Sequence, residues 1–100
     1  MFILELTYTV PAERVDGVLA DHVAWLDEQY EAGIFIASGR KVPRDGGVIV
    51  AVGEDRTAVE ALVATDPFVV DKVADYRIVE FVATKTALPL SAYRQQLPPA

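Results

Sequence analysis

The sequence predicts an α+β fold of the ferredoxin-like type, in which a four-stranded antiparallel sheet carries its helices on one face. Three observations favour this fold. Apolar and polar residues alternate at the start of the chain, as in a strand with one buried face. Apolar residues then recur at helical spacing. Strand-like segments flank a second, shorter helical segment. The expected order is therefore strand, helix, strand, strand, helix, strand, in one domain over residues 1–84.

The first strand and the first helix meet at Pro11. The strand is expected to stop there, and a proline suits the first turn of a helix, where its missing N–H group would have no partner. Helical spacing then continues to Gly33, a common C-terminal stop, so one continuous helix is predicted over about residues 11–32. The positions on its sheet-facing stripe are Val15, Val18, Leu19, His22, Val23, Leu26 and Tyr30.

Two apolar segments, residues 34–38 and 48–52, are predicted to form a hairpin. The loop between them contains Asp45-Gly46-Gly47, a strong turn signal. Residues 48–52 are apolar at every position, which makes both faces of this strand apolar. Helices on one side leave the other face bare. We therefore expect a second copy of the chain to pack its sheet there, giving a homodimer.

A second helix is expected before the last strand. Thr57 and Glu60 have the spacing of a capping box at its start. Asp66 and Pro67 then predict a new helical turn, with the aspartate as the cap and the proline at the first helical position. Residues 76–84 are the predicted last strand.

The C-terminal tail, residues 85–100, contains apolar side chains among prolines and predicts no strong element. We expect it to pack on the dimer partner, and a frayed terminus is the alternative. Trp25 and Tyr30 of the first helix are expected to pack at the subunit boundary.

Composition excludes several classes of protein. Apolar residues make up 52% of the chain and charged residues 24%, as in a globular domain. With no cysteine and one histidine, neither a thiol nucleophile nor an all-protein zinc site is expected. A net charge of −6 disfavours nucleic acid and membrane surfaces as partners. The chain has no secretion-signal pattern and no apolar run of about 20 residues, so a cytoplasmic location is expected. It has no glycine-rich phosphate loop and no G-x-S-x-G motif, so neither a nucleotide enzyme nor a serine hydrolase is expected.

His22 is the residue whose position most needs an explanation. It lies on the sheet-facing stripe of the first helix, where an imidazole without a partner would cost about 1–3 kcal/mol. A polar partner or a cavity is therefore expected beside it. From the residues alone, a satisfied core histidine is the simpler interpretation, and Asp66 is equally well explained as a helix cap.

The end of the second strand contains Ser38-Gly39, which predicts a bulge or a close approach of the backbone. Arg40, Lys41 and Arg44 follow and gather positive charge in an acidic protein, which can attract a ligand bearing a carboxylate. A solvated loop is the simpler explanation for Lys41 and Arg44.

Several motifs together resemble those of the YCII-related proteins of the dimeric α/β-barrel superfamily. They are Asp21-His22-Val23-Ala24-Trp25-Leu26, Gly33, Ala37-Ser38-Gly39, Gly46-Gly47 and Asp66-Pro67-Phe68. The resemblance covers about residues 1–84 and implies a ferredoxin-like protomer, a dimer whose two sheets enclose a barrel, and a pocket with a His–Asp pair. On this sequence the pair is His22 with Asp66, and Ser38 is the nearby polar group. Arg40 departs from the family, whose members often have a proline there.

The resemblance implies a small enzyme of the lyase, dehydrochlorinase-like or isomerase type that uses no cofactor and no metal. His22 would be the general base for a small aromatic-derived or carbonyl-containing compound, Asp66 would orient it, and Ser38 would steady negative charge. A non-catalytic dimer that binds a small ligand is the alternative, and a structural dimer stabilised by the pair is a third hypothesis. The residues expected to contact the ligand are Gly39, Arg40 and Phe68.

Overall fold

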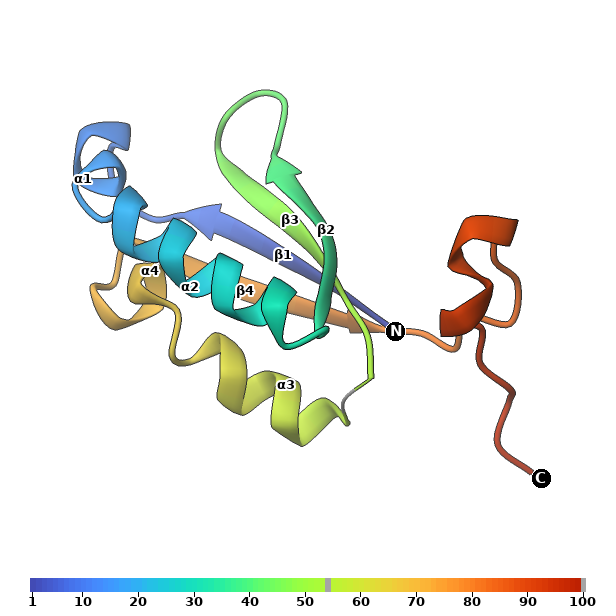
Figure 1. The fold of residues 1–100 in the computed structure, drawn as a ribbon. Helices are drawn as coiled ribbons and strands as arrows, with labels where there is room; N and C mark the ends of the chain where they lie inside the picture. Colours follow the sequence, from blue (N-terminus) through green and yellow to red (C-terminus); the bar gives the residue numbers. More distant parts are fainter. Residues whose placement is uncertain (54, 100) are drawn as a thin grey trace.

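A four-stranded antiparallel sheet with the order β2-β3-β1-β4 forms the centre of the computed structural model, which describes residues 1–53 and 55–99 (Figure 1). The strands are β1 (Phe2–Tyr8), β2 (Phe35–Arg40), β3 (Gly46–Ala51) and β4 (Ala74–Glu80). The helices are α1 (Ala12–Asp16), α2 (Leu19–Glu31), α3 (Arg56–Val63), α4 (Pro67–Val70) and the 3₁₀ helix η1 (Leu88–Tyr93). This order confirms the predicted α+β, ferredoxin-like fold class. None of the helices in the described part of the chain is long and apolar enough to cross a membrane.

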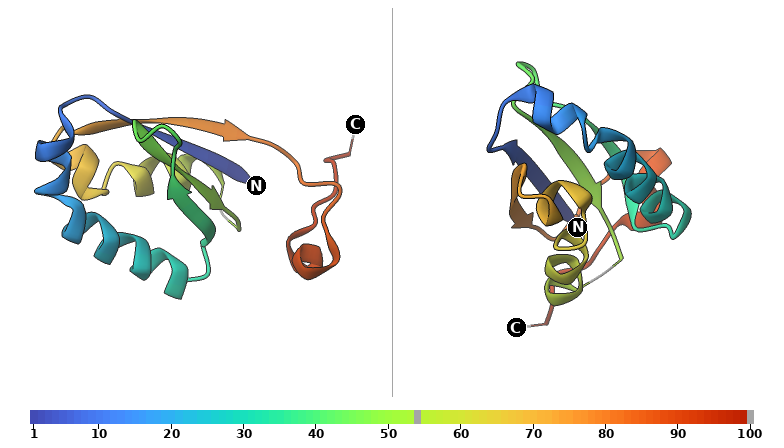
Figure 2. Two further views of the ribbon diagram at one scale, coloured as in Figure 1. Left: turned by 90° about the horizontal axis from the view of Figure 1, so that it is seen from above. Right: turned by 90° about the vertical axis from the view of Figure 1, so that its left-hand side faces the viewer.

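Strand β1 is central and pairs antiparallel with both β3 and β4. Its alternating pattern puts Phe2 and Leu4 on the face that the helices cover, where both side chains are buried. Figures 1 and 2 show α1, α2, α3 and α4 on this same side of the sheet. Strand β4 ends where β1 begins, since Glu80 pairs with Phe2, and the predicted extension to residue 84 was wrong for that reason.

The predicted continuous helix is two helices. Helix α1 stops at Gly17, and the Val18 N–H group bonds to the Val15 carbonyl oxygen at 3.0 Å before α2 begins. The break lets the fully buried Val15 pack against Leu6 and Phe68, while α2 runs along the sheet. Apolar spacing is the same on both sides of Gly17, so the pattern alone gives no sign of the break.

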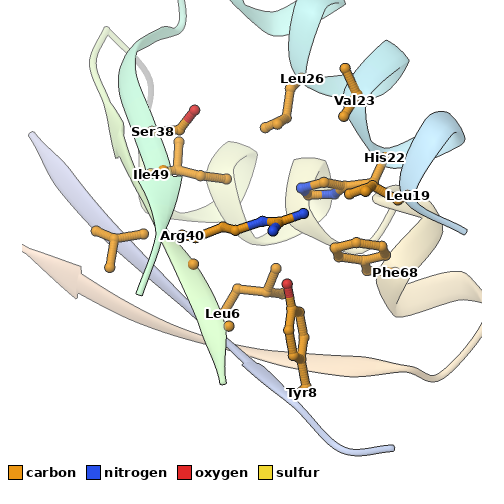
Figure 3. Close-up of a pocket in the computed structure, with 14 residues that line it drawn as sticks. Leu6, Tyr8, Leu19, His22, Val23, Leu26, Ser38, Arg40, Ile49 and Phe68 are labelled. Atoms are coloured by element: carbon orange, nitrogen blue, oxygen red, sulfur yellow. The ribbon is translucent and has the colours of Figure 1, made fainter. Parts of the chain in front are cut away.

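The hairpin is longer than predicted. Strand β2 continues to Arg40 and β3 already begins at Gly46, because backbone pairing persists through the glycines of both strands. The expected bulge at Ser38-Gly39 was misplaced, since the register shifts between Phe35 and Ala37. Beyond this shift the side chains of Ser38 and Arg40 lie on the helix-covered side of the sheet, next to α2 (Figure 3).

The start of α3 also differs from the expectation. Asp55 is the cap, and its side chain accepts a hydrogen bond from the Ala58 N–H group at 2.8 Å. Thr57 therefore lies inside the first turn. Glu60 pairs instead with Arg56, one helical turn away, at 3.0 Å.

Trp25 lies in the core of one chain, which corrects its expected place at a subunit boundary. It is 7% exposed and packs edge-on against Phe35, with 5.4 Å between ring centroids. Its indole N–H group donates to Thr65 Oγ1 at 2.9 Å, and Thr65 Oγ1 in turn donates to the Leu62 carbonyl oxygen. This pairing fastens α2 to the segment between α3 and α4.

The other face of the sheet and the C-terminal tail both leave apolar groups uncovered. Val79 on this open face is 39% exposed, and Val48 and Val50 are half-buried. Helix η1 has no buried residue. The segment after η1 returns to the body of the protein at Gln95, whose backbone N–H donates to the Ala83 carbonyl oxygen and whose Oε1 accepts from the Ala83 N–H, both at 2.9 Å.

Strand β3 approaches β1 so closely at Gly46 that no side chain fits. A Cβ atom there would lie 1.7 Å from the Leu6 carbonyl oxygen, whereas a Cβ atom at Gly39 would meet nothing within 4 Å. We expect Gly46→Ala to lower the free energy of unfolding by about 1–3 kcal/mol and Gly39→Ala to change it by about 0.5 kcal/mol at most. Urea unfolding of both variants measures the difference, and equal effects would contradict this packing.

Candidate active site

His22 projects from the first turns of α2 toward the sheet. Its side chain is 9% exposed, and its Nδ1 atom lies 2.8 Å from Oδ1 of Asp66, 44 residues further along the chain. The structure therefore brings together the two residues that the family resemblance implied as a pair.

Asp66 occupies the N-cap of α4, as expected, and is fully buried. Its Oδ1 atom also accepts from the Phe68 N–H group at 2.9 Å, and its Oδ2 atom accepts from the Tyr76 hydroxyl at 2.6 Å. The same carboxylate thus caps α4 and holds the imidazole of His22. The cap fixes the carboxylate against the start of α4, and the imidazole uses the oxygen that the cap presents.

The pattern of donors around Asp66 decides which histidine nitrogen carries a proton. A carboxylate only accepts hydrogen bonds, so the bond at 2.8 Å requires a proton on His22 Nδ1. In the neutral imidazole Nε2 then holds a free lone pair. A histidine held in this way can take a proton from a molecule beside Nε2.

Tyr76 of β4 completes the surroundings of Asp66. Burial raises the pKa of the Tyr76 hydroxyl far above its usual value, and the negative charge of Asp66 and the hydrogen bond to it raise that pKa further. Tyr76 therefore stays protonated over the whole physiological range. It remains a hydrogen-bond donor and keeps Asp66 Oδ2 occupied.

A pocket of about 220 Å³ opens between α2 and the strands β1, β2 and β3 (Figure 3). His22 forms part of its wall, and its ring lies flat on Phe68, with 3.9 Å between ring centroids and 5° between planes. Most of the wall is apolar, and Tyr8, Ser38 and Arg40 are the other side chains that bring polar atoms to it. The complete lining is Leu6, Tyr8, Leu19, His22, Val23, Leu26, Ser38, Gly39, Arg40, Gly46, Gly47, Val48, Ile49 and Phe68.

A family model, the YCII-related domain, matches residues 1–82. This chain belongs to the YCII-related family. A solved structure of similar fold is 5-chloro-2-hydroxyhydroquinone dehydrochlorinase (TftG) from Burkholderia phenoliruptrix AC1100, in complex with 2,5-dihydroxybenzoquinone. The similarity covers 81% of this chain and 93% of that chain, with a TM-score of 0.64 and 18% sequence identity. A comparison with curated protein sequences gives no significant match.

Five of the six predicted site residues of this YCII-related domain line the pocket: His22, Ser38, Gly39, Arg40 and Phe68. Asp66 stands behind the imidazole and touches the site through it. The hydroxyl of Ser38 lies 2.6 Å from that of Tyr30, so it is already engaged at the rim. Within the described residues, no group of three or more histidine, cysteine, aspartate or glutamate side chains is placed to hold a metal ion.

Sequence reasoning missed Tyr8 in the pocket wall and Tyr76 behind Asp66. Both belong to predicted strands, and both lie on the same side of the sheet as the buried Leu6, with which Tyr76 is paired across β1 and β4. The alternation indicates which sheet face they occupy. It does not indicate that the hydroxyl of Tyr76 reaches a carboxylate ten residues back, because this depends on the path between α4 and β4.

Replacing Tyr76 with phenylalanine removes one donor from the buried carboxylate, so we expect the free energy of unfolding at neutral pH to fall by about 1–3 kcal/mol. The alkaline pH dependence also changes. Folded Tyr76 stays protonated, whereas an unfolded tyrosine ionises near pH 10. The stabilisation is thus complete below about pH 10 and declines above it by about 1.4 kcal/mol per pH unit. The variant lacks this decline.

Urea unfolding at a series of pH values measures both effects. Tyr93→Phe is a matched control, since Tyr93 lies in the tail and is 37% exposed. It should follow the wild type at every pH. Identical alkaline slopes for wild type and Tyr76→Phe would contradict the raised pKa.

Proposed function

We propose that this protein is a small cofactor-independent enzyme of the lyase or isomerase type, with His22 as its general base. The observation that carries this proposal is the 2.8 Å contact between His22 Nδ1 and Asp66, which leaves Nε2 of a pocket-lining imidazole as the free acceptor. A buried histidine with a purely structural role would not need a cavity beside it. Here the ring forms one wall of the pocket.

In the proposed reaction, Nε2 of His22 takes a proton from a carbon or oxygen of the bound compound. The electron pair left behind either forms a new double bond as a leaving group departs, or shifts within the molecule until the proton is returned elsewhere. The first course is an elimination and the second an isomerisation. Asp66 stabilises the imidazolium that forms and holds the ring in place, because its oxygens are occupied by His22, Phe68 and Tyr76.

Ser38 is the proposed polar contact for negative charge that develops on the substrate, together with a neighbouring backbone N–H group. Its hydroxyl bonds with Tyr30 at the pocket rim, so it would have to share or exchange that partner when a ligand binds. Gly39 and Phe68 are the proposed contacts for the body of the ligand. The aliphatic side chains of the pocket wall suit a planar ring.

The structural similarity to TftG supports elimination as the first reaction to test. That enzyme is a dehydrochlorinase, which removes a proton and a chloride ion from 5-chloro-2-hydroxyhydroquinone, and its structure holds 2,5-dihydroxybenzoquinone. Loss of HCl needs one base and no redox partner. A His–Asp pair without a metal is sufficient for such a step.

We expect 5-chloro-2-hydroxyhydroquinone to release chloride in the presence of the protein, and His22→Gln to lower kcat/KM by about 10²- to 10⁴-fold. Asp66→Asn should also lower it, because the ring loses its charged partner. Asp71→Asn, at the other end of α4, is the control and should retain full activity. A chloride electrode or an ion-selective assay follows the release, and circular dichroism checks that each variant is folded.

Retained turnover in His22→Gln would contradict the proposed base. Binding of 2,5-dihydroxybenzoquinone without any chloride release would favour the second candidate, a non-catalytic dimer that binds small ligands. A specific observation supports that candidate, since the pocket is mostly apolar and needs no chemistry to hold a ring.

We further propose that the protein is a homodimer that joins two open sheet faces, with the tail from residue 85 packed on the partner. The partly exposed valines of β3 and β4 and the exposed apolar side chains of η1 support this arrangement. Covering them in a second copy would remove both exposed apolar surfaces in one interface.

Multi-angle light scattering tests the dimer. We expect twice the 10.9 kDa chain mass at all accessible concentrations for the wild type. Val79→Asp places a charge on the open face and should give monomers, whereas Val70→Asp, at a valine on α4 that is 62% exposed, should remain dimeric. A wild-type monomer would contradict the proposal.

A further inference from the structure

Arg40 is the cation of the pocket. It is the last residue of β2 and pairs with Gly47 of β3, which has no side chain to block the space above it. In Figure 3 the Arg40 guanidinium extends across the pocket toward His22 and Phe68. Arg40 is exposed to solvent, yet its side chain also lines the pocket beside apolar residues.

The two neighbouring cations, Lys41 and Arg44, are paired with carboxylates outside the pocket. Lys41 lies 3.4 Å from Glu5 and bonds with Thr7 on the open face of the sheet. Arg44 bonds with Asp16 at 2.5 Å. This hydrogen bond is the main reason that the pKa of Asp16 is lowered, and Arg40 contributes the smallest share.

Arg40 itself has no carboxylate within 4.0 Å among the described residues. The pocket lining contains no aspartate or glutamate. Asp66, the carboxylate behind its wall, is occupied by three donors and separated from the pocket by the imidazole. Arg40 is thus an exposed cation with no direct ion pair among the described residues, so its guanidinium N–H groups are available to a ligand in the pocket.

We propose that Arg40 makes this pocket selective for a small planar compound that carries an anionic oxygen. The guanidinium would bind the oxygen through paired N–H groups, while the ring packs on the apolar wall of the pocket. A volume of about 220 Å³ is below the roughly 300 Å³ at which pockets hold drug-sized molecules, so the ligand is expected to have one ring.

This inference deepens the proposed function, because it concerns the same pocket. An anionic oxygen held at Arg40 would direct the rest of the molecule toward Nε2 of His22. If a proton is then removed, the new negative charge spreads toward the same oxygen and is stabilised by the same guanidinium. Arg40 would set both the ligand class and the orientation.

Benzoate and benzamide are suitable probes, since they have the same size and planarity and differ by one negative charge. Both are titrated into the ¹⁵N-labelled protein, and amide shifts around the pocket give the dissociation constants. We expect the wild type to bind benzoate about tenfold or more tightly than benzamide, as a charged hydrogen-bonded pair implies.

Three variants test whether the preference for benzoate depends on the Arg40 guanidinium. Arg40→Gln should remove the preference for benzoate while leaving benzamide binding unchanged, and Arg40→Lys should keep part of it because the charge remains without the paired donors. Lys41→Gln is the matched control. It removes the same charge one residue along the chain, on the opposite face of the sheet, and should behave as the wild type.

The proposal is overturned if benzoate is not preferred, if the preference survives in Arg40→Gln, if it disappears equally in Lys41→Gln, or if neither probe shifts pocket amides. These results do not depend on turnover. A protein that prefers benzoate through Arg40 but loses no activity in His22→Gln would retain this inference and reject the proposed base. The reverse pattern would reject only the anion preference.

Discussion

A buried carboxylate is the constraint around which this structure is arranged. Asp66 has no exposure to solvent, and an unpaired charge in that position would be very costly. Three donors prevent that cost, and they come from α2, the first turn of α4 and β4. The side chain of Asp66 therefore joins α2 to α4 and β4, which follow much later in the sequence. Each donor serves the fold first, and the orientation of the His22 imidazole is a consequence of satisfying the carboxylate.

The pocket depends on the same constraint. Because Asp66 and Phe68 belong to one short turn, the ring of Phe68 lies under the imidazole that Asp66 holds, and the two rings stack. The Nδ1 side of the ring faces the protein interior and the ring borders the cavity. The opposite wall of the pocket is made of strands whose glycines keep it open, with Arg40 as its charged group. An imidazole and a guanidinium thus share one cavity, while Asp66 lies behind the imidazole.

Much of this arrangement follows from the sequence. Alternation in residues 2–10, the hairpin signals and the Asp66-Pro67 helix start lead to the observed strand and helix order. The His22–Asp66 pair was predicted from the family resemblance, since periodicity only places His22 on the buried stripe. The remaining features depend on three-dimensional paths. The break at Gly17, the bulge before Ala37 and the reach of Tyr76 to Asp66 leave no periodic trace, because local spacing is the same with and without them.

The central claim is that Asp66 holds His22 with its proton on Nδ1 and its lone pair on Nε2. Long-range ¹H–¹⁵N correlation spectra of the imidazole measure this directly, since the two ring nitrogens have distinct shifts in each tautomer, and the single histidine leaves no ambiguity of assignment. In the neutral form we predict the Nδ1–H tautomer, with a bound-proton signal that disappears in Asp66→Asn. A spectrum of the Nε2–H tautomer, or one that is unchanged in the variant, would contradict the account.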